Sequence, residues 1–302
     1  MFFVDSADMT PVIIEAAING VANKARNPHV PCEPAEIAAD ALACLGAGAA
    51  IVHNHIDQFG SPAPVAAARY LEGWRPVLAQ RPDAILYPTV GFGGDIVERY
   101  AHIPLLAEQH AIRMSLFDSG SVNLGALGDD GLPGGGFDLV YANSFGDVRH
   151  MAALCERYRL GPSVAVFEPG FLRTVLAYWR AGRLPRGTFV KFYFGGDFDY
   201  LGGARGVSFG LPPTPTALAA YLELLGDCDV PWAVAVIGGD VVESGMARLA
   251  LERGGHLRVG LEDYAGPRQP RNVELVEEAA ALARAVGREI ADTGQTSALL
   301  GL

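Results

Sequence analysis

Cysteine is scarce in this chain of 302 residues, which contains four. Cys32, Cys44, Cys155 and Cys228 stand far apart and form no CxxC pair. A disulfide framework and a thiolate metal site both need paired or closely spaced cysteines. The spacing therefore argues against both, and we expect the four thiols to be buried or incidental.

Positive charge is also in short supply. Lysine and arginine together number 23 against 34 acidic residues, so the formal net charge is −11. Such a chain repels phosphate backbones, and no basic cluster interleaved with aromatic residues occurs in it. We therefore expect no nucleic-acid partner.

Long apolar runs are missing as well. No run approaches the roughly 20 residues that a membrane helix requires. The first ten residues, MFFVDSADMT, reach the acidic Asp5 and Asp8 quickly, which is not the pattern of a signal peptide. These features predict a cytoplasmic protein without a membrane partner.

The chain does contain enough apolar residues for a large core, since half of it is hydrophobic and 19% is charged. Short apolar runs of β character alternate with segments of helical spacing, as parallel strands joined by crossover helices do. The eight runs are 11–19, 49–56, 83–89, 112–118, 163–168, 188–194, 232–237 and 256–262. Segments with helical spacing include 34–48, 64–80, 243–255 and a final helix at 272–287.

This alternation predicts an α/β fold, a single (β/α)8 TIM barrel over residues 1–302. The main competitor is a doubly wound open sheet, but no GxGxxG follows the first strand and no Walker loop is present. An extra apolar run at 137–144 interrupts the alternation, so either it or 112–118 is not a barrel strand. The glycine-rich stretches 125–136 and 194–216 follow strands and should form loops at the C-terminal face, where barrel active sites lie.

The strongest chemical signal is IVHNHID, in which His53 and His55 stand two residues apart at the end of a strand. Side chains alternate along a strand, so both imidazoles should point inward. Catalytic zinc takes three protein ligands and keeps one position open. The last strand ends in Glu262 and Asp263 and neighbours the first, so Glu262 can supply the oxygen ligand. The competing interpretation is a pair of hydrogen-bonded core histidines, but their position at the strand end favours one zinc per chain.

Other polar residues after strands have two possible roles. Thr89, Ser121 and Asn123 can orient a bound oxyanion or carbonyl, or can cap the following helix. Lys24 can meet a substrate carboxylate, or can be a solvated loop lysine. We interpret the remaining histidines as structural or surface residues: His29, His102, His110, His150 and His256.

The combination of three segments is similar to a known family. They are AAINGVANKARNPHVPCEPAEIAADALACLGAGAAIVHNHI, MSLFDSGSVN and GGHLRVGLEDY. Together they resemble the β-keto acid cleavage enzymes, typified by the 3-keto-5-aminohexanoate cleavage enzyme, along most of the chain.

The resemblance implies a (β/α)8 barrel, often a homotetramer, with zinc bound by His53, His55 and Glu262. It implies that Asp263 assists proton movement and that Thr89 stands where the family has a substrate-contacting serine. The implied reaction is a retro-Claisen type exchange, in which a β-keto acid and acetyl-CoA give acetoacetate and a new acyl-CoA.

Several pocket positions depart from the family pattern. Asp57 follows the HxH motif where the family has an arginine, and Gly239 stands where an arginine usually ends the seventh strand. Ala22 or Asn23 replaces a glutamate, and the fifth strand keeps only Glu168 of an acid-rich pattern.

An arginine missing at Gly239 removes a fixed cation that contributes a few kcal/mol to transition-state stabilisation, on the order of an oxyanion-hole donor. Lys24 or Arg205 could replace that charge. Two alternatives therefore stay open: another metal-dependent lyase or hydrolase on the same barrel, and a binding protein that kept the metal but lost the reaction.

Overall fold

The computed structural model describes residues 10–58, 60–199, 205–206 and 209–302. The acidic start with Asp5 and Asp8, and part of the 194–216 loop, lie outside the described residues.

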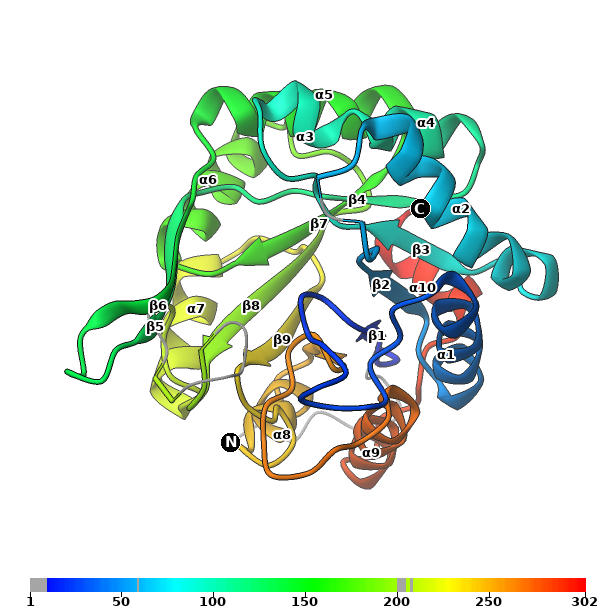
Figure 1. Ribbon diagram of the computed structural model, residues 1–302. Helices are drawn as coiled ribbons and strands as arrows, with labels where there is room; N and C mark the ends of the chain where they lie inside the picture. Colours follow the sequence, from blue (N-terminus) through cyan, green and yellow to red (C-terminus); the bar gives the residue numbers. More distant parts are fainter. Residues whose placement is uncertain (1–9, 59, 200–204, 207–208) are drawn as a thin grey trace.

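Eight parallel strands form a nearly closed barrel with helices around it (Figure 1). Their hydrogen-bonded order is β3-β2-β1-β10-β9-β8-β7-β4, and β3 lies next to β4 where the ring closes. The strands are β1 (Ile14–Ala17), β2 (Ile51–Asn54), β3 (Ile85–Pro88), β4 (Met114–Leu116), β7 (Gly161–Val166), β8 (Phe189–Gly195), β9 (Trp232–Ile237) and β10 (His256–Val259). Each predicted run contributes one of these strands, so the predicted α/β TIM barrel is confirmed.

The extra apolar run belongs to a separate two-stranded sheet. Strand β5 (Val122–Leu127) pairs with β6 (Pro133–Tyr141) in antiparallel register, and this hairpin projects from the side of the barrel (Figure 1). Run 112–118 contains β4 and is a barrel strand. The glycine-rich stretch 125–136 includes the turn of the hairpin, which explains why a β-like run follows it.

The helices cover the outside of the barrel (Figure 1). They are α1 (Pro34–Ala47), α2 (Ala63–Gln80), α3 (Ile96–Tyr100), α4 (His102–Glu108), α5 (Phe145–Tyr158), α6 (Pro169–Arg180), α7 (Pro215–Leu225), α8 (Met246–Leu251), α9 (Asn272–Ala285) and α10 (Thr293–Leu300). The four predicted helical segments contain α1, α2, α8 and α9. Among the described residues, no helix has both the length and the apolar composition needed to cross a membrane.

The prediction that α9 is the final helix is wrong, because α10 follows it. This helix has eight residues, too few to show a clear apolar period. It begins with a capping box, in which the Asp292 side chain accepts a hydrogen bond from the Gln295 N–H (2.7 Å). The sequence signal for α10 was therefore its cap.

His256 has the structural role expected of it, at the N-terminal end of β10. The side chain is buried, and its Nδ1 accepts a hydrogen bond from the backbone N–H of Ile13 on the neighbouring chain segment (3.0 Å). Burial, reinforced by the charge of Arg288, lowers the pKa of His256 to about 3. The folded protein therefore holds a neutral imidazole that the unfolded chain would protonate in mild acid.

We predict that this histidine makes the protein acid-sensitive. Its folded pKa lies below its unfolded value of 6.5, so its contribution to stability is complete above pH 6.5 and is lost as the pH falls toward 3. At pH 5 the expected loss from this one site is about 2 kcal/mol. Urea unfolding at pH 7.5 and pH 5 measures it, with His256→Gln as the non-titrating comparison. An equal loss in both proteins would contradict the assignment.

Candidate metal centre

The three predicted metal ligands meet at the C-terminal mouth of the barrel. His53 Nε2 lies 3.4 Å from Glu262 Oε2, and His55 Nε2 lies 3.5 Å from Glu262 Oε1. The three candidate ligand atoms all lie within 4.8 Å of one another. Both imidazoles thus point to the same side, as strand alternation requires. Glu262 does not belong to the strand itself, since β10 ends at Val259 and Glu262 lies in the following turn.

Two buried asparagines fix the backbone beside these ligands. Asn19 accepts a hydrogen bond from the N–H of His55 (2.8 Å) and donates one to its carbonyl oxygen (3.1 Å). Asn272 accepts from the N–H of Leu261 (2.8 Å) and donates to the carbonyl of Ile18 (2.7 Å). The loops that present His55 and Glu262 are therefore tied to the end of β1.

Two glycines make this arrangement possible. Gly20 has a φ of 55°, and a Cβ there would lie 2.3 Å from Cγ of Glu262. Gly260 has a φ of 138°, and a Cβ there would lie 2.0 Å from the carbonyl oxygen of Ala17. Both positions combine a left-handed backbone with close approach, which only glycine allows without strain.

His53 is oriented for ligation by the strand beside it. Its Nδ1 lies 3.2 Å from the carbonyl oxygen of Tyr87, and its ring stacks on the Tyr87 ring at 4.4 Å. A carbonyl can only accept, so Nδ1 carries the hydrogen and the Nε2 lone pair faces Glu262. Burial lowers the pKa of His53 to about 3, which keeps the imidazole neutral and able to bind a metal.

Arg258, which the sequence analysis did not select, is the central cation of the site. Its Nη2 lies 3.1 Å from Glu262 Oε1, and its Nη1 donates to Glu15 (2.8 Å). Its Nε and Nη2 bind the two oxygens of Asp263 (2.8 and 3.0 Å). The available signal was an arginine in the buried run HLRV, since a charge inside a strand of a barrel needs partners.

The pKa values of the adjacent residues Glu262 and Asp263 are shifted in opposite directions. Burial works to raise the pKa of Glu262, but the charge of Arg258 holds it well below its usual range. Burial raises the pKa of Asp263 to about 6, against the opposing charge of Arg258. Glu262 is thus a permanent carboxylate, suited to hold a cation.

Beneath Arg258, a second layer of buried polar groups crosses the barrel. Lys191 on β8 donates to Glu15 (3.1 Å), to the Tyr87 hydroxyl (2.8 Å) and to Ser163. The Tyr87 hydroxyl in turn donates to Glu15 (2.5 Å). Burial works to raise the pKa of Glu15, but the charges of Lys191 and Arg258 lower it to about 2. The sequence signal was again a charge inside an apolar run, in VIIEAA and FVKFYF.

A cavity of about 470 Å³ opens above these layers. Its polar lining includes the three candidate ligands and Arg258, together with Thr89 and Asp118. Its apolar lining includes Leu116, Leu124, Leu139, Phe167 and Tyr193. Thr89 is therefore placed where a substrate contact is possible, as predicted.

The other predicted substrate contacts do not line this cavity. Lys24 is exposed and forms an ion pair with Glu36. Ser121 and Asn123 are exposed as well, and Ser121 exchanges hydrogen bonds with the backbone of Asn143 (2.9 and 3.1 Å). Thr89 lines the cavity and stays a predicted substrate contact, whereas Ser121 and Asn123 lie at the start of the hairpin on the barrel's side.

The structure also shows the surroundings of Asp57 and Gly239, which stand where the family has arginines. Asp57 receives two hydrogen bonds from Arg69 (2.9 and 2.8 Å). Gly239 has no room for a side chain, because a Cβ would lie 2.7 Å from Val236. Arg205 is 80% exposed and lies 4.0 Å from Asp197. Neither Lys24 nor Arg205 therefore replaces the missing charge in this structure, whereas Arg258 already stands in the cavity.

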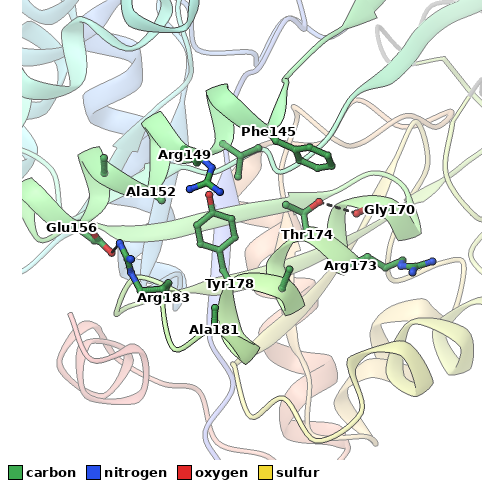
Figure 2. Close-up of a pocket in the computed structure, with 13 residues that line it drawn as sticks. Phe145, Arg149, Ala152, Glu156, Gly170, Arg173, Thr174, Tyr178, Ala181 and Arg183 are labelled. Carbon is green, nitrogen blue, oxygen red and sulfur yellow. Dashed lines mark hydrogen bonds and ion pairs between the residues drawn. The ribbon is translucent and has the colours of Figure 1, made fainter.

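A larger cavity, of about 660 Å³, lies between α5 and α6 on the outside of the barrel (Figure 2). Figure 2 shows two local contacts among its polar groups: Thr174 donates to the carbonyl of Gly170 (3.3 Å), and Arg183 lies 3.8 Å from Glu156. None of the candidate ligands lines it. We therefore place the chemistry in the smaller inner cavity.

Comparison with known proteins identifies the family of this chain. A family model described as beta-keto acid cleavage enzyme matches residues 11–302. The chain belongs to the β-keto acid cleavage enzyme family. This confirms the resemblance found in the sequence.

Characterised relatives of this family match the chain over nearly all its length. A 3-oxoadipate:acetyl-CoA acetyltransferase of Cupriavidus necator is 31% identical over 97% of this chain and 95% of its own. A 3-keto-5-aminohexanoate cleavage enzyme of Fusobacterium nucleatum is 28% identical over 97% and 99%. A 3-dehydrocarnitine:acetyl-CoA trimethylamine transferase of Rhizobium meliloti is 26% identical over 92% of each chain.

Among solved structures, apo ObcA shares the fold, with a TM-score of 0.65 at 17% identity over 92% of this chain and 66% of its own. Membership of this family is the basis on which we interpret the site.

We predict that the buried cation Lys191 is a major determinant of stability. Replacing it with methionine leaves Tyr87 and Ser163 without their common donor and Glu15 with one cation fewer. Breaking a buried pair in this way costs about 3–5 kcal/mol. The matched control is Arg183→Met, because Arg183 forms an exposed pair, and such pairs contribute about 1 kcal/mol or less. Chemical denaturation of both variants tests this, and similar losses would contradict the assignment.

Proposed function

We propose that this protein is a zinc-dependent β-keto acid cleavage enzyme that uses acetyl-CoA as its co-substrate. In the proposed exchange, the bond between the keto carbon and the carboxymethyl carbon of the β-keto acid breaks. The acetyl group joins the carboxymethyl carbon to give acetoacetate, and the remaining acyl group joins the CoA sulfur. The observation that supports it best is the convergence of His53, His55 and Glu262 in a chain of this family.

The donor set fits zinc. Two imidazole nitrogens and one carboxylate are a known catalytic set, which leaves a coordination position for substrate. Oε2 of Glu262 is buried, and within the described part of the chain it has no hydrogen-bond partner, so a cation would satisfy it. When bound, zinc would polarise the keto carbonyl of the substrate as a Lewis acid.

The chain's own residues would supply the remaining charge and orientation. Arg258 presents a fixed guanidinium to the cavity, where it can stabilise negative charge that develops on the substrate. Both oxygens of Asp263 are held by that guanidinium, so we assign Asp263 the role of positioning Arg258. The proton-transfer role that the resemblance implies would require Asp263 to release Arg258. Thr89 is the predicted substrate contact that the cavity retains.

The apolar lining contributes by excluding water. A thioester can be attacked by water as well as by the intended carbon nucleophile, so acyl transfer benefits from a dry site. Leu116, Leu124, Leu139 and Phe167 line the cavity beside the polar centre. The substrates named for the relatives, 3-oxoadipate, 3-keto-5-aminohexanoate and 3-dehydrocarnitine, differ beyond the keto carbon. Family membership therefore leaves the substrate open.

The first test is metal content. We expect about one zinc per chain in protein purified without chelators, as a single three-ligand site requires. His53→Ala and Glu262→Ala should each lose it, whereas His29→Ala, which changes an exposed histidine, should keep it. Elemental analysis measures all four proteins. A wild type that contains no metal would refute the zinc centre.

The second test is turnover with acetyl-CoA and a panel of β-keto acids, detecting acetoacetate and acyl-CoA together. Arg258→Met should lower kcat/KM by about 10²–10³, the usual effect of losing one group that stabilises an oxyanion. Arg268→Met, which removes an exposed arginine, is the control. Zinc content and circular dichroism of each variant show whether the fold and the metal survive.

The same assay separates the alternatives. Cleavage that proceeds equally well without acetyl-CoA would indicate a metal-dependent lyase or hydrolase. A zinc-loaded protein that binds β-keto acids and turns none of them over would indicate a binding protein.

A further inference from the structure

The inner cavity holds a carboxylate that the proposed metal centre does not use. Asp118 follows β4, is 4% exposed, and lines the cavity together with His53 and Glu262. The hydroxyl of Tyr141, from the β5–β6 hairpin, donates to its Oδ2 (2.5 Å). Its Oδ1 is buried and, among the residues that the structure describes, has no hydrogen-bond partner.

This carboxylate differs from the three carboxylates that surround Arg258. Glu15, Glu262 and Asp263 each lie within 3.1 Å of an Arg258 nitrogen. Asp118 forms no ion pair with a described residue, whereas a buried carboxylate ordinarily has one. An unsatisfied buried acceptor destabilises the free protein, so a ligand that supplies a donor is favoured there.

The surroundings of Asp118 would strengthen such an interaction. Leu116, Leu124, Leu139 and Phe167 line the same cavity, and the Tyr141 and Phe167 rings lie 6.3 Å apart. A charge-assisted hydrogen bond gains strength where apolar walls exclude water. Burial raises the pKa of Asp118, against the hydrogen bond from Tyr141 and the more distant charges of Lys191 and Arg258.

The position of Asp118 suits the far end of a substrate held at the metal centre. Strand β4 lies beside β3 where the ring closes, and the order continues β2, β1, β10. Two strands, β3 and β2, therefore separate β4 from β1. The candidate ligands come from β2 and from the turn after β10, on either side of β1. Because Asp118 and the candidate ligands line one cavity, a keto acid bound at the ligands can extend toward Asp118.

We propose that Asp118 is the specificity residue of this enzyme and binds a hydrogen-bond donor, preferentially a protonated amine, on the substrate chain beyond the keto group. This inference rests on the proposed function. An ammonium group supplies both the donor and the positive charge that Asp118 lacks, and a hydroxyl group supplies the donor alone. A terminal carboxylate meets like charge and is disfavoured.

The test uses zinc-loaded protein and β-keto acids of equal chain length that end in a methyl, hydroxyl, ammonium or carboxylate group. We expect kcat/KM to be highest for the ammonium acid, by about 10- to 100-fold over the methyl acid, since hydrogen bonds to charged groups have that effect. The carboxylate acid should be the poorest. In Asp118→Asn the ammonium advantage should disappear, mainly through KM, while the methyl acid changes less than about threefold.

Two further variants isolate the effect. Asp129→Asn makes the same charge change at an exposed residue between β5 and β6 and should keep the preference. Tyr141→Phe keeps the carboxylate and should also keep it. Equal rates for all four acids, a preference for the carboxylate acid, or an ammonium preference that survives Asp118→Asn would overturn the proposal.

A readout without turnover separates this proposal from the proposed function. Calorimetric titration of the same acids into the zinc-loaded protein, in the absence of acetyl-CoA, measures binding alone. Ammonium-selective binding that Asp118→Asn abolishes would support the role of Asp118 even if no acid were cleaved, in which case the proposed reaction fails and the specificity residue stands. If the acids are cleaved but neither their binding nor their cleavage depends on Asp118, the proposed reaction stands and the role of Asp118 is refuted.

Discussion

The guanidinium of Arg258 is the interaction on which the rest of the site depends. It touches Glu15 below, Glu262 toward the cavity and Asp263 to the side, and it is itself buried. No single carboxylate would offset the cost of burying this cation, but three together with the Lys191 layer can. The same contacts fix the position of Glu262, which is the one oxygen donor among the candidate metal ligands. Arg258 therefore both holds the buried cluster together and positions a candidate metal ligand.

The balance of formal charge in this cluster would favour a cation above it. Lys191 and Arg258 contribute two positive charges, and Glu15, Glu262 and Asp263 contribute three negative ones. The buried set is thus one negative charge in excess, and a divalent ion would reverse the sign. With a divalent ion this cluster would carry net positive charge beside an open position, which suits the carboxylate of a keto acid at that end of the cavity; without the ion the cluster would repel it.

The fold and the convergence of His53, His55 and Glu262 could be predicted because the strand pattern implies a barrel, which brings the ends of β2 and β10 to either side of β1. Strand and helix periodicity placed all eight barrel strands, and the two-residue spacing placed His53 and His55 on one face. The central cation was missed because Glu262 and Asp263 reach it only through the turn after β10, and its third partner, Glu15, is 243 residues away. Lys24 and Arg205, the residues expected to replace the missing arginine, lie in loops, whereas the cation that lines the cavity, Arg258, lies within β10. The hairpin residues Ser121 and Asn123 were misplaced because a spacing rule cannot say where an insertion leads.

One consequence of burying Lys191 concerns the covalent chemistry of the surface. Lys24 and Lys191 are the two lysines of this chain. Lys191 is fully enclosed, whereas the side chain of Lys24 is 46% exposed in the loop after β1. Acylating reagents, including any thioester that the protein handles, therefore meet a single accessible lysine amine. Attachment through lysine would tether every molecule at that one point, with the same face turned outward each time.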